Sequence, residues 1–153
     1  MRFEKTVSVK APLQEVWDLF WDHERLFPCI KGFKKAEVIE PKSRYSVHVM
    51  EKVGPFKVNF AIDAEVIEIE ELHHAQLKAA GKDSKIAATF RQHGELKLRK
   101  VSDEETELQF ATDVSIFGKL ATLGRWVIKR KADEGMEYFV RSIKTRLEKD
   151  GGI

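Results

Sequence analysis

Residues 45–62 read YSVHVMEKVGPFKVNFAI, and apolar side chains alternate with polar ones on both sides of the Gly54-Pro55 pair. The same alternation returns in shorter stretches between residues 86 and 116. A repeat of two residues is typical of β-strands that have one buried and one solvated face. The Gly-Pro pair is a turn signal between two such strands. These stretches therefore predict an antiparallel sheet whose inner face is apolar.

One long amphipathic segment follows these strands, over residues 119–149. It is predicted to be a helix whose apolar stripe packs on the sheet. A strongly curved sheet wrapped round a single helix tends to leave a cavity between them, so we expect a protein that binds an apolar molecule rather than a catalyst. The predicted stripe consists of Ile128, Ala132, Met136, Phe139, Ile143 and Leu147.

The remaining elements complete the α+β class. A helix is predicted to begin at Pro12, because proline suits the first helical turn, and Asp22 is expected to cap a second short helix. The apolar phase flips between Val66 and Ile67, which indicates a bulge or bend. Strands are predicted at residues 3–9, 33–40, 44–53, 56–70, 72–80, 85–99 and 106–117, with a turn at 80–83.

Composition limits the classes of protein to consider. The 153 residues are most simply one domain, over residues 1–150, and a net charge of +2 argues against a general nucleic-acid-binding protein. The single cysteine, Cys29, forms no intrachain disulfide, and the N-terminus lacks the apolar core of a signal peptide. No apolar run approaches the ~20 residues of a membrane span. We therefore expect a cytoplasmic protein whose only membrane contact is peripheral, at the inner face.

Inward-facing positions supply the candidates for the wall of the cavity. Thr112 and Gln92 are the polar side chains in the inward phase, and they are suited to orient a ligand carbonyl or hydroxyl. Trp21 and Phe27 lie off the main stripe of the first helix, so they are candidates, with Trp126, for the cavity entrance. The predicted wall consists of Val47, Val49, Val58, Phe60, Ile62, Phe90, Leu108, Phe110, Thr112 and Met136.

A basic, Trp-bearing surface is predicted at the start of the last helix. At 100° per residue, Leu123 and Trp126 fall nearly opposite the apolar stripe. Indole beside lysine and arginine suits anionic lipid headgroups, so this face is a candidate membrane or partner surface. Alternatively, Trp126 packs under the loop at residues 22–30, or closes the mouth of the cavity. The basic members are Lys119, Arg125, Lys129 and Arg130.

Catalysis and metal binding find little support in these residues. Asp63, Glu65 and Asp113 fall in the outward phase of their strands, and no histidine or carboxylate clearly faces inward. The histidines lack metal-ligand spacing, and no nucleophile or phosphate-loop motif is present. We therefore predict no catalytic residue, no metal site and no cofactor.

Several short segments together resemble the START-like helix-grip superfamily, which includes polyketide cyclases and the birch-pollen-allergen type. Within it, the chain is most similar to the carbon monoxide dehydrogenase G-subunit family (CoxG). Lys31 stands where that family typically has a proline, which makes the turn less rigid. The segments are 11–12 (AP), 16–17 (VW), 22–26 (DHERL), 29–32 (CIKG), 52–56 (KVGPF) and 118–124 (GKLATLG).

This resemblance implies a seven-stranded sheet that grips the last helix, with a hydrophobic cavity between them. It also implies a ligand such as a lipid, an isoprenoid or a quinone-like molecule, and a role in linking a carbon monoxide dehydrogenase-type oxidoreductase to the membrane. A cyclase or hydrolase acting on a hydrophobic substrate in the same cavity is the alternative that the superfamily implies. A protein-interaction adaptor with an incidental cavity is a third.

Overall fold

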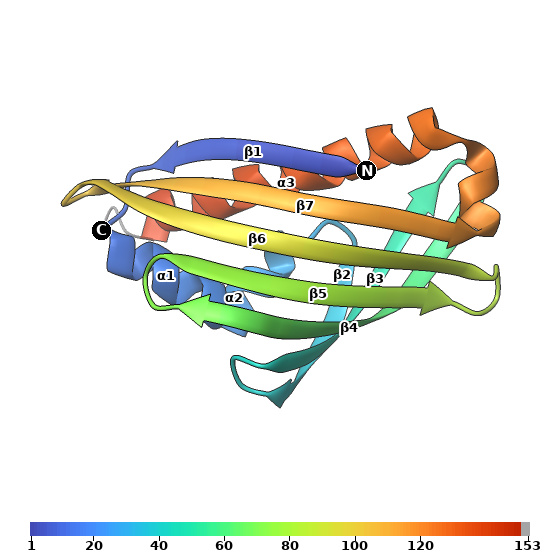
Figure 1. The fold of residues 1–153 in the computed structure, drawn as a ribbon, viewed down its shortest axis with the longest axis horizontal. Helices are drawn as coiled ribbons and strands as arrows, with labels where there is room; N and C mark the ends of the chain where they lie inside the picture. Colours follow the sequence, from blue (N-terminus) through green and yellow to red (C-terminus); the bar gives the residue numbers. More distant parts are fainter. Residues whose placement is uncertain (151–153) are drawn as a thin grey trace.

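A computed structural model describes residues 1–150, which form one curved antiparallel sheet and the helices that pack on it (Figure 1). The elements in chain order are β1 (Arg2–Val9), α1 (Leu13–Trp21), α2 (His23–Leu26), the 3-10 helix η1 (Phe27–Cys29), β2 (Phe33–Glu40), β3 (Arg44–Val53), β4 (Phe56–Glu70), β5 (His74–Asp83), β6 (Ala88–Ser102), β7 (Glu105–Gly118), the 3-10 helix η2 (Lys119–Leu123) and α3 (Arg125–Asp150). The predicted order of elements is confirmed.

The seven strands lie in the order β1-β7-β6-β5-β4-β3-β2, so β1 crosses over to pair with β7 while the others form a meander. Helix α3 runs along the inner face of this sheet (Figure 1). Helices α1 and α2 lie at one end of the sheet, and the β3–β4 turn lies at the other end, beside the segment that precedes α3. One face of every strand therefore meets helix or cavity, and the other meets solvent.

Two separate groups of buried residues hold α3 to the sheet. The larger lies at the α1 end, where Trp17, Leu108 and Ile143 are almost completely buried. The smaller lies at the opposite end, where Val58 and Ile128 pack together. The middle of α3 lies between these two clusters.

The register of β4 confirms the bulge that the sequence predicts. The pairing of β4 with β5 shifts between Val66 and Glu68, which leaves Ile67 as the extra residue. The bulge restores the alternation, so that Ile69 pairs with Ala75 on the inner side. A bulge of this kind bends the strand and increases its twist. It contributes to the curvature that separates the sheet from α3.

The turn predicted at residues 80–83 is wrong, because these residues belong to β5 and the turn lies at residues 84–87. Gly81 is a strand residue for a packing reason: a Cβ there would lie 2.3 Å from the ring of Phe90 on β6. Asp83 then organises the turn, since its carboxylate accepts the backbone N–H groups of Asn59 and Lys85 at 2.8 and 2.9 Å. Glycine and aspartate here report close packing and capping, one turn earlier than the reversal itself.

The last helix begins at Arg125, and not at residue 119 as the sequence predicts. Residues 119–123 form η2, which two glycines with positive φ enclose, Gly118 (+80°) and Gly124 (+91°). A Cβ at Gly118 would lie 1.9 Å from the carbonyl oxygen of Ala87, so only glycine fits there. Leu123 therefore does not follow the periodicity of α3. It packs beside Gly54 in the smaller buried cluster.

The side chain of Asp22 does not cap α2, which corrects a second helix-end prediction. Its backbone carbonyl accepts the N–H groups of Arg25 and Leu26 instead. Its carboxylate lies 3.8 Å from the guanidinium of Arg25. Because α2 is one turn long and runs directly into η1, backbone hydrogen bonds are enough to define it.

Candidate functional site

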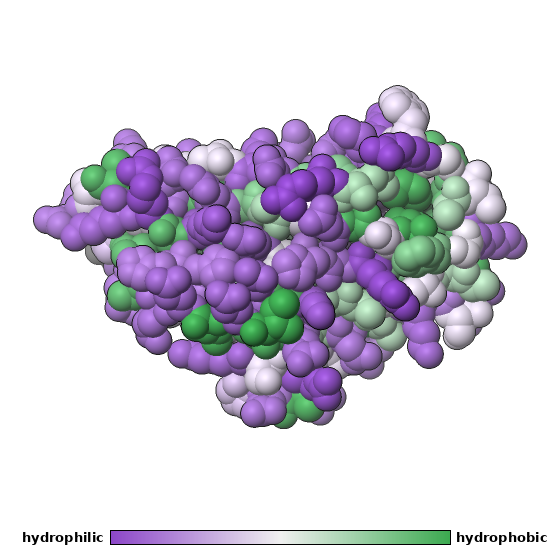
Figure 2. All heavy atoms as spheres, in the orientation of Figure 1, coloured by the Kyte–Doolittle hydropathy of each residue, from purple (hydrophilic) through white to green (hydrophobic). Residues whose placement is uncertain are grey.

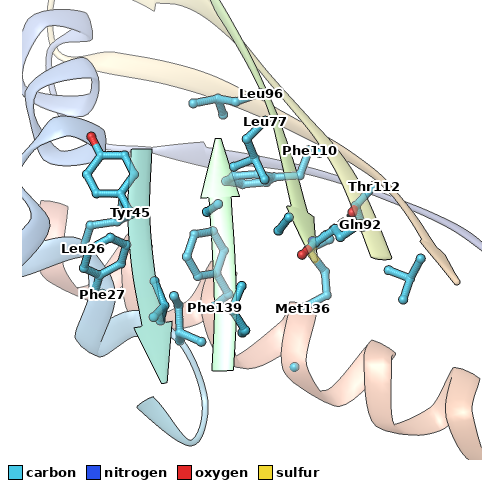
Figure 3. A pocket seen from close by; sticks show the side chains of 18 of the residues that line it. Leu26, Phe27, Tyr45, Leu77, Gln92, Leu96, Phe110, Thr112, Met136 and Phe139 are labelled. Carbon is cyan, nitrogen blue, oxygen red and sulfur yellow. Dashed lines mark hydrogen bonds between the residues drawn. The ribbon is translucent and has the colours of Figure 1, made fainter. Parts of the chain in front are cut away.

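A cavity of about 480 Å³ lies between the sheet and the middle of α3. Side chains from α1 through η1, from strands β3 to β7 and from α3 contribute to its wall (Figure 3). Most of these side chains are apolar. Its volume is within the range of about 300–1,000 Å³ that is typical of small-molecule sites.

Small side chains explain why the protein is hollow here and filled at both ends. The strands that face the middle of α3 carry Ala64, Ala79 and Gly94, and the helix carries Ala132 and Gly135. On either side of this zone, large apolar residues meet across the same interface and exclude water. Protein interiors are normally packed to crystal-like density, so a void of this size requires a local loss of side-chain volume.

Most of the predicted wall residues border the cavity. Their alternation along β3, β4, β6 and β7 places them on the inner face, as period-two strands require. Two of the three predicted entrance residues, Trp21 and Phe27, also border it. The wall residues in this group are Val47, Val49, Ile62, Phe90, Phe110, Thr112 and Met136.

The remaining predicted wall residues face inward but lie outside the cavity, because other side chains fill the space around them. Leu108 is fully buried in the larger cluster. Val58 is fully buried in the smaller cluster, and Phe60 packs there with its ring 4.8 Å from that of Phe90. Trp126 does not border the cavity either; it is 71% exposed, which also excludes packing under the loop at residues 22–30.

Several wall residues were missed by the sequence analysis, although a signal existed for some of them. Tyr45 and Leu96 belong to the same alternation as their predicted neighbours, and both point into the cavity (Figure 3). Leu77 lies opposite the bulge of β4, where the phase was harder to follow. Leu26 comes from α2, which is too short to display a helical repeat.

Gln92 and Thr112 form a polar pair inside the apolar wall, close to Met136 (Figure 3). The side-chain amide of Gln92 donates a hydrogen bond of 2.9 Å to the hydroxyl oxygen of Thr112. This bond occupies one amide hydrogen and one hydroxyl lone pair. The O–H of Thr112 can still donate, and the amide oxygen of Gln92 can still accept. The pair is therefore suited to bind a carbonyl or a hydroxyl group.

Ion pairs border the cavity where the chain before β2, strand β3 and α3 meet. The ammonium of Lys131 lies 3.0 Å from the carboxylate of Glu51, and that of Lys31 lies 3.6 Å from Glu134. Burial disfavours the charged form of Lys131, but the hydrogen bond and charge of Glu51 outweigh it and raise the pKa of Lys131. Glu51 continues the alternation of Val47 and Val49. It corrects the expectation that no carboxylate clearly faces inward.

The basic end of the molecule exposes aromatic rings beside cations. The guanidinium of Arg130 lies 5.6 Å from the ring centre of Trp126. Strand β7 ends nearby with Phe117, which is 48% exposed and has the guanidinium of Arg91 over its ring at 5.7 Å. Figure 2 shows apolar side chains gathered at this end of the molecule, with strongly hydrophilic ones among them. Within residues 1–150, no helix is long and apolar enough to cross a membrane.

Residues 6–148 match the model of the CoxG family, which is described as the G-type subunit of carbon monoxide dehydrogenase. No curated protein sequence matches the chain.

Solved structures share the fold along almost the whole chain. A conserved protein from Geobacillus kaustophilus superimposes with a TM-score of 0.87 at 23% identity, covering 97% of this chain and 96% of that one. A START superfamily protein from Mycobacterium smegmatis gives a TM-score of 0.72 at 16% identity, with 97% of each chain covered. An aromatase/cyclase from a Streptomyces species gives 0.69 at 15% identity, covering 97% of this chain and 93% of that one. Likeness at this level of identity establishes the helix-grip fold.

Proposed function

The chain belongs to the carbon monoxide dehydrogenase CoxG family, as its motifs predicted, and we propose that it binds one hydrophobic small molecule in the cavity beneath α3. The ligand class is a lipid, an isoprenoid or a quinone-like molecule. The observation that carries this proposal is the apolar cavity of about 480 Å³ with a hydrogen-bonding pair in its wall.

The affinity comes from apolar surface that the ligand removes from water. Each Å² of such surface contributes roughly 25 cal/mol, less the cost of ordering the ligand. Gln92 and Thr112 orient the ligand, because a carbonyl or hydroxyl placed against them replaces a solvent hydrogen bond inside an apolar wall. The ligand is thus an apolar body with one polar group.

Native mass spectrometry of freshly purified protein tests this proposal. We expect an extra mass that disappears on denaturation and is recovered in an organic extract. If the protein has its bare mass, incubation with lipids and quinones is the second arm of the test. A bare mass in both arms would refute ligand binding and favour the interpretation as an adaptor.

A second proposed role is to link a carbon monoxide dehydrogenase-type oxidoreductase to an anionic membrane. The exposed ring of Trp126 beside Arg130 supports it, since indole and guanidinium together suit the lipid headgroup region. The neighbouring cations, Lys119, Arg125 and Lys129, are each worth about 1 kcal/mol near a negative surface. Leu123 adds apolar area at the edge of this face.

Liposome binding tests the second role. Trp126→Ala should weaken binding to anionic vesicles several-fold and leave the thermal midpoint unchanged, because the side chain packs against little of the protein. Neutral vesicles and the exposed substitution Thr145→Ala on α3 serve as controls. Equal binding of the wild type to anionic and neutral vesicles, or no effect of Trp126→Ala, would remove this role.

A cyclase or hydrolase acting in the cavity remains the alternative, and Glu51 is the observation that favours it. A proton-transfer enzyme needs a group whose pKa lies near the working pH. Glu51 is paired with Lys131, and the raised pKa of Lys131 keeps its ammonium protonated as a partner for that carboxylate. This arrangement supports a structural ion pair at the rim. Turnover of an aromatic polyketide that Glu51→Gln abolishes would reverse this preference.

A further inference from the structure

Gly135 occupies the middle of α3, on the stripe that faces the sheet, and it borders the cavity. A glycine in a helix interior lowers stability relative to alanine, because the unfolded chain has more backbone freedom to lose. Its φ lies outside the left-handed region, so the backbone conformation does not require glycine. A Cβ at this position would meet no atom within 4 Å, so packing does not require it either.

The surroundings of Gly135 indicate what the missing side chain provides. One helical turn earlier, Lys131 forms the ion pair with Glu51 at the rim. The next residue is Met136, which lies close to the Gln92–Thr112 pair (Figure 3). The bare backbone of α3 therefore lies between the charged rim and the polar pair. Glycine is the residue that lets a ligand approach a helix backbone closely.

We infer that Gly135 determines which ligands the cavity admits, because the apolar body of the ligand lies directly against the backbone of α3 at this residue. The inference rests on the proposed function. A side chain at residue 135 would project into the space between the rim and the polar pair. It would stabilise the empty protein and exclude the ligand, so stability and binding change in opposite directions.

Two substitutions with a neutral fluorescent probe test this inference. Protein stripped of bound lipid on a hydrophobic resin is titrated with Nile red, and its thermal midpoint is measured. Gly135→Leu should weaken Nile red binding by at least tenfold, and Gly135→Ala by less. Both should keep or raise the thermal midpoint, with a gain of about 2–4 °C for each kcal/mol recovered. Thr145→Leu adds the same side chain to an exposed position of α3 and should change neither property.

The outcomes separate this inference from the proposed function. Nile red binding by Gly135→Leu that equals the wild type would overturn the role of Gly135 and leave the cavity proposal intact. A lower thermal midpoint for Gly135→Ala would also overturn it, because glycine would then be required for folding. If the wild type takes up neither Nile red nor any lipid or quinone, the proposed function itself fails.

Discussion

The inner face of the sheet has a filled end beside α1 and a hollow centre opposite the middle of α3. Both regions lie on the same strands: Leu108 is fully buried, while Phe110, two residues further along β7, borders the cavity. The difference lies in what faces them. Ile143 is buried in the cluster with Leu108, whereas the cavity is bounded by the small residues Ala132 and Gly135. The comparison teaches that a void in this fold is made by side-chain volume on the helix, with the strands unchanged in pattern.

The largest expected difference between the two regions is in stability. Leu108→Ala should lower the free energy of unfolding by about 3 kcal/mol, because it removes packed methyl groups and leaves a new void. Val49→Ala in the cavity wall should lower it by less than about 1.5 kcal/mol, since that side chain already faces an open space. Urea denaturation of both variants measures the difference. Equal losses would mean that the cavity wall is packed as tightly as the core.

A smaller and pH-dependent effect is expected at Asp83, beside the filled smaller cluster. Backbone N–H groups, that of Asn59 foremost, stabilise its carboxylate and lower the pKa of Asp83 in the folded protein. Its contribution to stability is therefore present above the unfolded pKa and is lost as the pH falls through the lower folded pKa. Asp83→Asn should lower the free energy of unfolding by about 1–2 kcal/mol at pH 7.

Thermal unfolding of the wild type and Asp83→Asn from pH 7 to pH 3 checks this expectation. The gap between their midpoints should narrow as the pH falls, because the wild type progressively loses the charge that the variant lacks. Ligand affinity should not change, since Asp83 does not border the cavity. A gap that stays constant over this range would contradict the role assigned to the carboxylate.

The smallest expected effect distinguishes two buried threonines. Thr112→Val should weaken binding of the natural ligand about 5–10-fold, because a hydrogen bond of about 1 kcal/mol is lost in the cavity. Thr106→Val removes a hydroxyl that donates to the carbonyl of Ala11 at 2.8 Å in the filled region. It should lower stability and leave affinity unchanged. Calorimetric titration with the extracted ligand compares the two, and equal affinities would exclude Thr112 from ligand recognition.

Much of the fold could be predicted because it depends on local periodicity. Alternation identified the strands and their inner faces, and the phase flip after Val66 located the bulge. The prediction was wrong where a residue serves a distant neighbour. Gly81 resembles a turn residue but makes room for Phe90, and Gly118 interrupts the final helix because of Ala87. Such contacts link residues on different strands, and a single sequence does not display them.

The candidate site could be predicted only in outline, for a related reason. Inward phase does not distinguish a cavity wall from a packed core, and so Val58, Phe60 and Leu108 were grouped with Val47 and Val49. Glu51 followed the inward alternation, but a charged residue near the end of a strand did not suggest a place in the wall. Gly135 had no local signal, because its meaning depends on what lies across the cavity.

By itself, the sequence determined the order of the elements, the curved antiparallel sheet, its apolar inner face and the family. These properties follow from side-chain alternation and short motifs, which act over a few residues along the chain. Only the tertiary structure decided where the protein is hollow, which side chains reach that space and that the rim is closed by ion pairs. Those properties depend on the volumes and charges that meet across the gap between α3 and the sheet.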